Sequence, residues 1–131
     1  MSYLDYLKIP HKHLGRDFNG CDCLGLILLF YKNSLNIALP DYTDYEEHWH
    51  LTDAKKVIRL YSSFGFTKTN TVNKYDIILI NESGYPKHLA IVLDESYMLH
   101  TIEAGTICSE YRQGFWADKI HSVYTRGLHC E

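Results

Sequence analysis

Hydrophobic residues follow different periods in the two halves of the chain. In residues 22–35 apolar side chains occupy nearly every face, which predicts a helix buried on most sides at the centre of the domain. A second, amphipathic helix is predicted from Thr52–Asp53, which supply an N-cap, and Gly65 ends it. A short amphipathic helix is expected at residues 2–8, followed by a loop at residues 9–21.

The second half of the chain reads as short strands separated by turn-forming residues. The predicted strands are 76–80, 88–93, 97–102, 106–111 and 121–125, with turns at 81–84, 94–96 and 104–105. Short links join antiparallel neighbours, so these strands predict a meandering sheet. Helices followed by such a sheet indicate an α+β fold, with the helix of residues 22–35 packed on one face of the sheet.

Length and composition limit the domain organisation and the partners. Residues 1–131 suit one domain, because 46% hydrophobic and 14% aromatic residues can form a substantial core. A formal charge of −3 without a basic run argues against nucleic acid or an anionic membrane surface as partner. Residues 1–10 contain no long apolar stretch, so we expect no signal peptide and no membrane insertion, and a chain that is made in a cytoplasm.

One cysteine stands at the entrance of the first predicted helix. Residues 19–28 form a small polar loop that runs directly into an apolar segment, with Asp22 as N-cap and Cys23 in the first turn. The unpaired N–H groups and the dipole of a helix N-terminus favour a thiolate, so Cys23 is the candidate nucleophile. Taken alone, an inert buried cysteine is the commoner fate of such a residue.

Two histidines supply a candidate base and a candidate orienting group. A three-residue loop at 94–96 pairs Leu93 with Tyr97, and this register places His88 and His100 on the same face of the sheet. A two-residue loop would separate them unless a bulge restored the register. Taken alone, His88 could be a hydrogen-bonded residue at a strand edge and His100 a satisfied core histidine.

The other cysteines have weaker claims to chemistry. Without a secretion signal, free thiols are a better expectation than disulfides for Cys21, Cys108 and Cys130. We expect Cys21 to serve in packing and the other two to have no chemical role.

A zinc-binding module is an alternative, because soft ligands are dense in this short chain. The candidate ligands are Cys21, Cys23, His11, His13, His48 and His50. Structural zinc sites prefer paired ligands two to four residues apart with a matching second pair, and this spacing does not supply them. The sequence around His48 and His50 reads as a solvated loop.

Residues 10–26 carry a recognisable motif, with Gly15, Gly20, Asp22, Cys23 and Gly25 in place. This motif resembles the nucleophile motif of the NlpC-type cell-wall cysteine peptidases. The position of His88 at the head of an apolar strand, and of His100 twelve residues later, resembles the other two catalytic motifs of that family. All three motifs occur in the family's order.

The resemblance implies a papain-like fold and a cysteine peptidase that needs no cofactor. Cys23 would attack, His88 would transfer the proton and His100 would orient His88. The implied substrate is a peptidoglycan stem peptide, cleaved at the amide between D-glutamate and a diamino acid.

The chain departs from the family's pattern at several positions. His11 replaces the usual tyrosine that helps to hold the oxyanion, and we expect His11 to donate a hydrogen bond there beside the Cys23 N–H. Asp22 is grouped with His11 as a residue for oxyanion or substrate binding. Leu24 replaces the usual serine after the nucleophile, and Tyr75 replaces a glycine before the first strand of the sheet.

Residues 29–42 resemble the helix and exit loop of NlpC-type proteins from bacteriophage tails. This resemblance implies a tail-tip component, made in the host cytoplasm, that contacts other tail-tip proteins and acts at the bacterial cell wall. The alternative is a structural or assembly component of a tail tip that keeps the peptidase fold with little catalysis.

Overall fold

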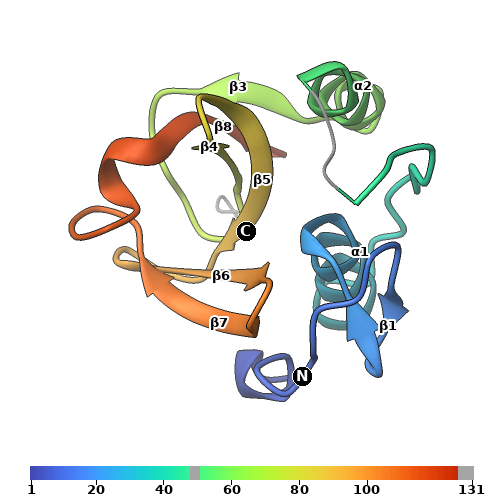
Figure 1. The fold of residues 1–131 in the computed structure, drawn as a ribbon. Coiled ribbons are helices and arrows are strands. Elements are labelled where there is room, and N and C mark those ends of the chain that lie inside the picture. Colours follow the sequence, from blue (N-terminus) through green and yellow to red (C-terminus); the bar gives the residue numbers. More distant parts are fainter. Residues whose placement is uncertain (48–50, 127–131) are drawn as a thin grey trace.

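The computed structural model describes residues 1–47 and 51–126, and its helices lie beside a curled antiparallel sheet (Figure 1). Both helices contact strand β5. In chain order the elements are the 3₁₀ turn η1 (Tyr3–Asp5), β1 (Arg16–Asp17), β2 (Gly20–Cys21), α1 (Cys23–Ser34), α2 (Leu51–Ser62), β3 (Thr67–Thr69), β4 (Ile77–Glu82), β5 (Tyr85–Val92), β6 (Tyr97–Ile102), β7 (Gly105–Glu110), the 3₁₀ turn η2 (Ala117–Lys119) and β8 (Ile120–Thr125). The predicted α+β class is confirmed.

Helix α1 occupies the centre of the larger core, as its apolar pattern predicts. Its buried side chains include Leu26, Ile27 and Phe30. They pack against alternate residues of the sheet, among them Leu89 and Ile91 of β5. Burial of this many large apolar side chains holds α1, and with it Cys23, in a fixed position relative to the sheet.

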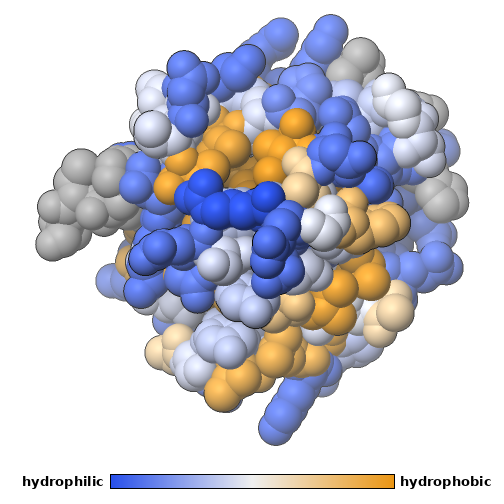
Figure 2. Space-filling model, turned by 90° about the vertical axis from the view of Figure 1, so that its left-hand side faces the viewer, coloured by the Kyte–Doolittle hydropathy of each residue, from blue (hydrophilic) through white to orange (hydrophobic). Residues whose placement is uncertain are grey.

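The opposite face of the sheet carries a second, smaller core. Ala90 and Val92 of β5 lie there with Met98 of β6 and Tyr111. Successive side chains of a strand point to opposite faces, so these residues alternate with the ones that contact α1. Figure 2 looks at the molecule from the side away from the helices, where hydrophobic patches are interrupted by strongly hydrophilic side chains.

The sheet is not the simple meander that the short links predict. Its strand order is β3-β8-β4-β5-β6-β7, because the last strand returns to lie between β3 and β4. Strand β3 is short and polar, which explains why hydrophobic alternation did not predict it. The long connection from β7 to β8 carries η2 and Trp116.

The N-terminal half differs locally from the prediction. Residues 2–8 form only the single turn η1, because a segment this short cannot offset the free energy needed to nucleate an α-helix. The loop at residues 9–21 contains the two-stranded hairpin β1–β2, which the pattern did not predict. Helix α2 begins at Leu51, one residue before the predicted cap.

Several predictions lie outside the described residues, namely those for His48, His50 and Cys130. Within residues 1–47 and 51–126, Cys21, Cys23 and Cys108 are free thiols. No helix in this part of the chain is long and apolar enough to cross a bilayer.

Candidate active site

Asp22 caps α1 and places Cys23 in its first turn, as predicted. The Asp22 carboxylate accepts a hydrogen bond from the Gly25 N–H at 2.8 Å, and its backbone carbonyl accepts from the Leu26 N–H at 2.9 Å. The first bond satisfies one of the N–H groups that a helix start leaves unpaired, and the second is the first regular hydrogen bond of the helix. Cys23 is partly buried and lines a cleft of about 280 Å³.

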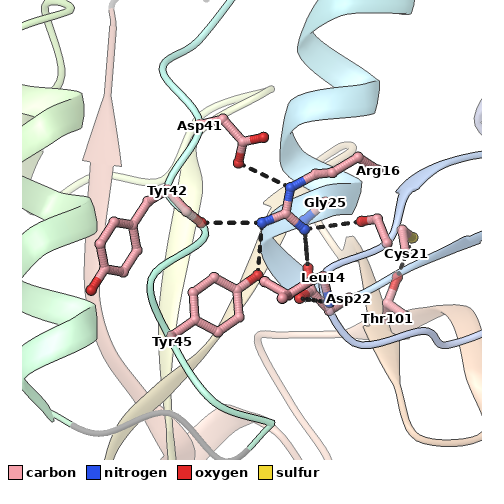
Figure 3. A network of polar contacts seen from close by, with 10 residues as sticks. Leu14, Arg16, Cys21, Asp22, Gly25, Asp41, Tyr42, Tyr45 and Thr101 are labelled. Carbon is pink, nitrogen blue, oxygen red and sulfur yellow. Dashed lines mark hydrogen bonds and ion pairs between the residues drawn. The ribbon is translucent and has the colours of Figure 1, made fainter.

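The Asp22 carboxylate also holds the loop that precedes it. Besides Gly25, it accepts hydrogen bonds from the Leu14 N–H and the Arg16 guanidinium, both at 2.9 Å, and from the Tyr45 hydroxyl (Figure 3). Two donors reach each carboxylate oxygen, and the residue is buried. The geometry therefore makes Asp22 a residue that positions the loop, and its role in oxyanion or substrate binding stays a prediction.

Arg16 ties this loop to the segment that leaves α1. Its guanidinium donates to the Asp41 carboxylate at 2.9 Å, to the Tyr42 carbonyl at 3.1 Å and to the Tyr45 hydroxyl at 2.8 Å (Figure 3). Burial acts to lower the pKa of Arg16, but the contacts with Tyr45 and Asp22 raise it above its ordinary value. The guanidinium therefore stays charged and links two loops beside the cleft through its hydrogen bonds.

Two motif glycines allow the loop to approach α1 closely. A Cβ atom on Gly25 would lie 2.1 Å from the Gly15 carbonyl oxygen, and one on Gly15 would lie 2.3 Å from the Gly20 carbonyl oxygen. These are backbone atoms that cannot move aside cheaply, so neither position accommodates a larger residue. The Gly15 carbonyl also accepts a hydrogen bond from Arg16 at 2.9 Å.

The sheet opens where Cys23 meets it. Strands β5 and β6 pair at Ile91 with Leu99 and at Val92 with Met98, and no further pairs form between them in the described residues. The Leu93 N–H points towards β6 and donates to the Tyr97 carbonyl. By alternation the Leu89 N–H points the same way, and it is near enough to the Cys23 sulfur to act towards lowering the pKa of the thiol. Cys23 thus lies beside the part of β5 that β6 leaves unpaired.

The predicted register of the histidines is confirmed. Pairing of Ile91 with Leu99 is the register in which Leu93 faces Tyr97, and His88 Nε2 lies 2.8 Å from His100 Nδ1. Both side chains are buried. This hydrogen bond fixes the orientation of both rings. It leaves Nδ1 of His88 and Nε2 of His100 available for other partners.

The spare nitrogens of the two rings meet different surroundings. His88 lines the cleft with Cys23, and its Nδ1 lies 3.7 Å from the Glu82 carboxylate. His100 Nε2 lies 2.8 Å from the Ser109 hydroxyl. Trp116 covers both rings, with ring centroids 5.8 Å from His88 and 4.7 Å from His100.

Burial decides the protonation states in the free protein. It raises the pKa of the Cys23 thiol to about 12, and the nearby charge of Asp22 acts in the same direction. Burial also lowers the pKa of His88 to about 3, reinforced by His100 and Lys87, and lowers that of His100 to about 4. Removal of the sulfur from water thus opposes the thiolate that the helix N-terminus favours, and burial favours a neutral thiol beside a neutral imidazole.

The remaining lining of the cleft is mostly polar and carries both signs of charge. His11 lies on its wall, where the Cys21 N–H donates to the Pro10 carbonyl at 3.0 Å and fixes the adjacent backbone. The lining also includes His13, Tyr45, Glu82, Lys87 and Glu103. Four of the five predicted site residues line this cleft, namely His11, Asp22, Cys23 and His88. The fifth, His100, lies behind His88 and is hydrogen-bonded to it.

Sequence reasoning missed Ser109, Trp116, Tyr45 and Glu82. Ser109 could have been found, because a tight turn after Ile102 pairs Met98 with Ser109 and so places the serine on the same face as His100. The other three approach the site through the folding of long connections or through a bulge in the pairing of β4 with β5, and the local pattern carries no signal for them.

The zinc-module alternative receives no support from the described part of the chain. Within those residues no group of three or more histidine, cysteine, aspartate or glutamate side chains is arranged to hold a metal ion. Cys21 instead lies 3.5 Å from the Thr101 hydroxyl in the core, which agrees with its predicted packing role.

Comparison with known proteins identifies the family. The family model of the NlpC/P60 family matches residues 8–125. No curated protein matches the sequence. Among solved structures, the NlpC/p60 domain of the peptidoglycan hydrolase SagA is similar, with a TM-score of 0.64 and 14% identity over 93% of this chain and 91% of that one.

Two further structures share the fold. An NLP/P60-family protein similar to lipoprotein from Staphylococcus aureus matches with a TM-score of 0.61 and 20% identity over 92% of this chain and 37% of that one. An NlpC/P60-family protein from Bacillus cereus matches with a TM-score of 0.59 and 17% identity, over 90% and 35%. This chain thus spans about a third of the length of these two proteins. The predicted papain-like fold is confirmed, and the chain belongs to the NlpC/P60 family.

Proposed function

We propose that this protein is a cysteine peptidase that hydrolyses an amide bond in peptidoglycan stem peptides. The observation that carries the proposal is the hydrogen bond between His88 Nε2 and His100 Nδ1. It leaves Nδ1 of His88 free of His100, and His88 lines the cleft together with Cys23, where a base for the thiol is needed. Membership of the NlpC/P60 family and the likeness to a domain of a peptidoglycan hydrolase support the same activity.

The first chemical step starts from the neutral pair. As the Cys23 sulfur forms a bond to the carbonyl carbon of the substrate, its proton passes to Nδ1 of His88. The imidazolium that results donates from Nε2 to His100, which holds the ring in place. Because burial opposes both charges before the reaction, thiolate and imidazolium form only as the bond to substrate forms.

The tetrahedral intermediate needs hydrogen-bond donors for its oxyanion. The backbone N–H of Cys23, in the first turn of α1, and the side chain of His11 on the cleft wall are the proposed donors. Collapse breaks the carbon–nitrogen bond, and the leaving amine takes the proton from His88. Water then attacks the thioester with His88 as base, which releases a carboxylate and restores the Cys23 thiol.

The polar lining of the cleft suits a substrate with charges of both signs. Lys87 can face a carboxylate, whereas Glu82 and Glu103 can face an ammonium group. Stem peptides carry both kinds of group. By family resemblance we propose the amide between D-glutamate and a diamino acid as the bond that is cleaved.

The proposed setting is a bacteriophage tail tip, with other tail-tip proteins as partners and the bacterial cell wall as the place of action. This part of the proposal rests on the resemblance of residues 29–42 to tail-associated members of the family. In that setting the protein would be made in the host cytoplasm and carried to the wall by the virion.

Digestion of purified sacculi tests the activity. The parent protein should release soluble fragments whose masses and new termini, determined by mass spectrometry, identify the bond. Cys23→Ala should release none. Cys108→Ala is the matched control, since Cys108 is a partly buried thiol on β7 away from the cleft lining, and it should behave as the parent does.

Two outcomes would contradict the proposal. Equal release by the parent and by Cys23→Ala would exclude Cys23 as the nucleophile. Folded parent protein that releases nothing from sacculi of several wall chemistries would favour the alternative, a structural component that retains the peptidase fold.

A further inference from the structure

The hydrogen-bonded histidines continue into a third residue. His100 Nε2 lies 2.8 Å from the Ser109 hydroxyl oxygen, so His88, His100 and Ser109 form an unbroken chain of two hydrogen bonds. The chain runs from the cleft across β5, β6 and β7. Ser109 pairs with Met98 in the sheet, and its backbone position is fixed by the regular ladder between β6 and β7.

Which atom donates and which accepts in these two hydrogen bonds follows from the role of His88 as base. To accept a proton from Cys23, neutral His88 must have a lone pair on Nδ1 and its hydrogen on Nε2. That hydrogen points at His100 Nδ1, which must then be the acceptor. His100 therefore carries its own hydrogen on Nε2, and this hydrogen points at the Ser109 oxygen.

We propose that Ser109 is a positioning residue that accepts the hydrogen bond from His100 Nε2 and thereby holds both histidines in the tautomer that keeps Nδ1 of His88 open. The part of this inference that concerns catalysis rests on the proposed peptidase function. The part that concerns tautomers is a property of the folded protein and stands apart from it.

A hydroxyl suits this place better than a charged or an apolar group. It accepts the hydrogen bond without adding a negative charge that would favour a protonated His100. The His100 side chain has no exposed surface, and its ring packs perpendicular to Trp116, with ring centroids 4.7 Å apart. The His100 ring is therefore shielded from water, and the half-buried Ser109 is its hydrogen-bond partner on the β7 side.

Loss of the hydroxyl has a defined consequence. A buried N–H without an acceptor is unfavourable, so His100 would move its hydrogen to Nδ1. That hydrogen would face His88 Nε2, which must then act as acceptor and place the hydrogen of its own ring on Nδ1. In this state His88 has no lone pair for the thiol proton.

Nitrogen NMR of the parent protein tests the tautomers directly. Both rings are neutral near pH 7 because burial lowers their pKa values, so the ¹⁵N shifts of histidine-labelled protein distinguish protonated from unprotonated nitrogens. We expect both His88 and His100 to be protonated on Nε2. Protonation of His100 on Nδ1 would overturn the inference, whether or not the protein has peptidase activity.

Substitution tests the contribution to catalysis. Ser109→Ala should lower kcat on stem peptides about 5- to 100-fold, which corresponds to the usual effect of leaving one buried donor unpaired. The KM should stay nearly unchanged, because Ser109 does not line the cleft. Ser109→Thr keeps the hydroxyl and should restore most of kcat. Ser122→Ala, which removes a buried hydroxyl from β8 of the same sheet, should leave kcat unchanged.

The alkylation rate of Cys23 is a second measurement that needs no substrate. Iodoacetamide reacts with the sulfur after its proton has left, so Ser109→Ala should slow labelling of Cys23, whereas labelling of Cys108 should not change. Equal kcat and equal Cys23 labelling in the parent and in folded Ser109→Ala would overturn the positioning role. Parent protein that lacks hydrolysis but shows the expected tautomers would contradict the proposed function alone.

Discussion

The two faces of β5 divide the molecule between stability and chemistry. Leu89 and Ile91 point into the larger core with α1. The adjacent residues His88 and Ala90 point to the opposite face, where Trp116 also lies. The face towards α1 carries the larger apolar core. The other face carries the smaller core and two imidazoles, whose nitrogens are hydrogen-bonded to each other and to Ser109.

The difference shows how one strand supports both a core and a polar site. The α1 face fixes the helix, so the position of Cys23 depends on packing. The opposite face buries the imidazoles, and it can do so at a tolerable free-energy cost because three of the four ring nitrogens have hydrogen-bond partners. Cys23 and His88 meet at the cleft that both residues line.

Substitutions of two neighbouring residues of β5 should show the largest difference, one in kcat and the other in the free energy of unfolding. His88→Gln keeps a side chain able to bond to His100 but cannot act as the base, so kcat should fall by roughly 10²- to 10⁴-fold. Leu89→Ala should lower the free energy of unfolding by about 2–5 kcal/mol, yet leave kcat of the folded fraction close to that of the parent.

Urea unfolding and sacculus digestion, measured on the same samples, provide both quantities. If Leu89→Ala inactivates fully folded protein as strongly as His88→Gln does, the division between the faces of β5 is not real.

The orienting residue should matter less than the base. His100→Asn retains a hydrogen-bonding group beside His88 Nε2, whereas His100→Ala removes it, so His100→Asn should keep more activity, by about tenfold. Steady-state kinetics with circular dichroism and melting as checks on folding would measure this. Full activity in His100→Ala would make His100 a packing residue of the smaller core.

Acid should lower the free energy of unfolding through the two buried histidines, His88 and His100. Folding lowers the pKa of His88 to about 3 and that of His100 to about 4, from about 6.5 in the unfolded chain. Between these pH values the unfolded state binds more protons, so the stability due to neutral histidines is fully present above pH 6.5 and is lost as pH falls towards 4. The slope is at most about 1.4 kcal/mol per pH unit for each histidine.

His100→Asn removes one of these titrations and should flatten the decline in the free energy of unfolding between pH 7 and pH 5. Burial raises the pKa of Glu82, which acts in the opposite direction, but Glu82 is present in both proteins being compared. Identical pH dependence in the two proteins would show that His100 is not held neutral by the fold.

Loss of a single hydroxyl from the network of Arg16, Asp22 and Tyr45 should have the smallest effect on stability. Tyr45→Phe removes one of four donors to the Asp22 carboxylate and one acceptor of Arg16, so it should cost about 1 kcal/mol of stability. Tyr3→Phe, at an exposed position, should change stability by less than about 0.5 kcal/mol. Urea unfolding compares the two, and equal effects would mean that the hydroxyl of Tyr45 contributes no net stability.

Much of the fold and of the site is local in origin and could be predicted. The start of α1 follows from Asp22 as a cap, and its burial follows from apolar residues on nearly every face. The shared face of His88 and His100 follows from strand alternation and the length of one loop. Each inference uses residues a few positions apart, where steric and hydrogen-bonding rules are strong.

Other features required contacts that are distant along the chain. Insertion of β8 between β3 and β4, and the bonds of Arg16 to Asp41 and Tyr45, join segments that no short pattern links. Trp116 arrives over the imidazoles through the long connection between β7 and β8.

The sequence by itself determined which residue types could do the chemistry, the helix that presents Cys23 and the strand face that holds the histidines. The tertiary structure alone decided which residues of β5 and β6 pair, and that burial favours the neutral forms of Cys23 and His88. The physical reason is that caps and alternation act between near neighbours, whereas desolvation depends on everything that surrounds a group in the folded protein.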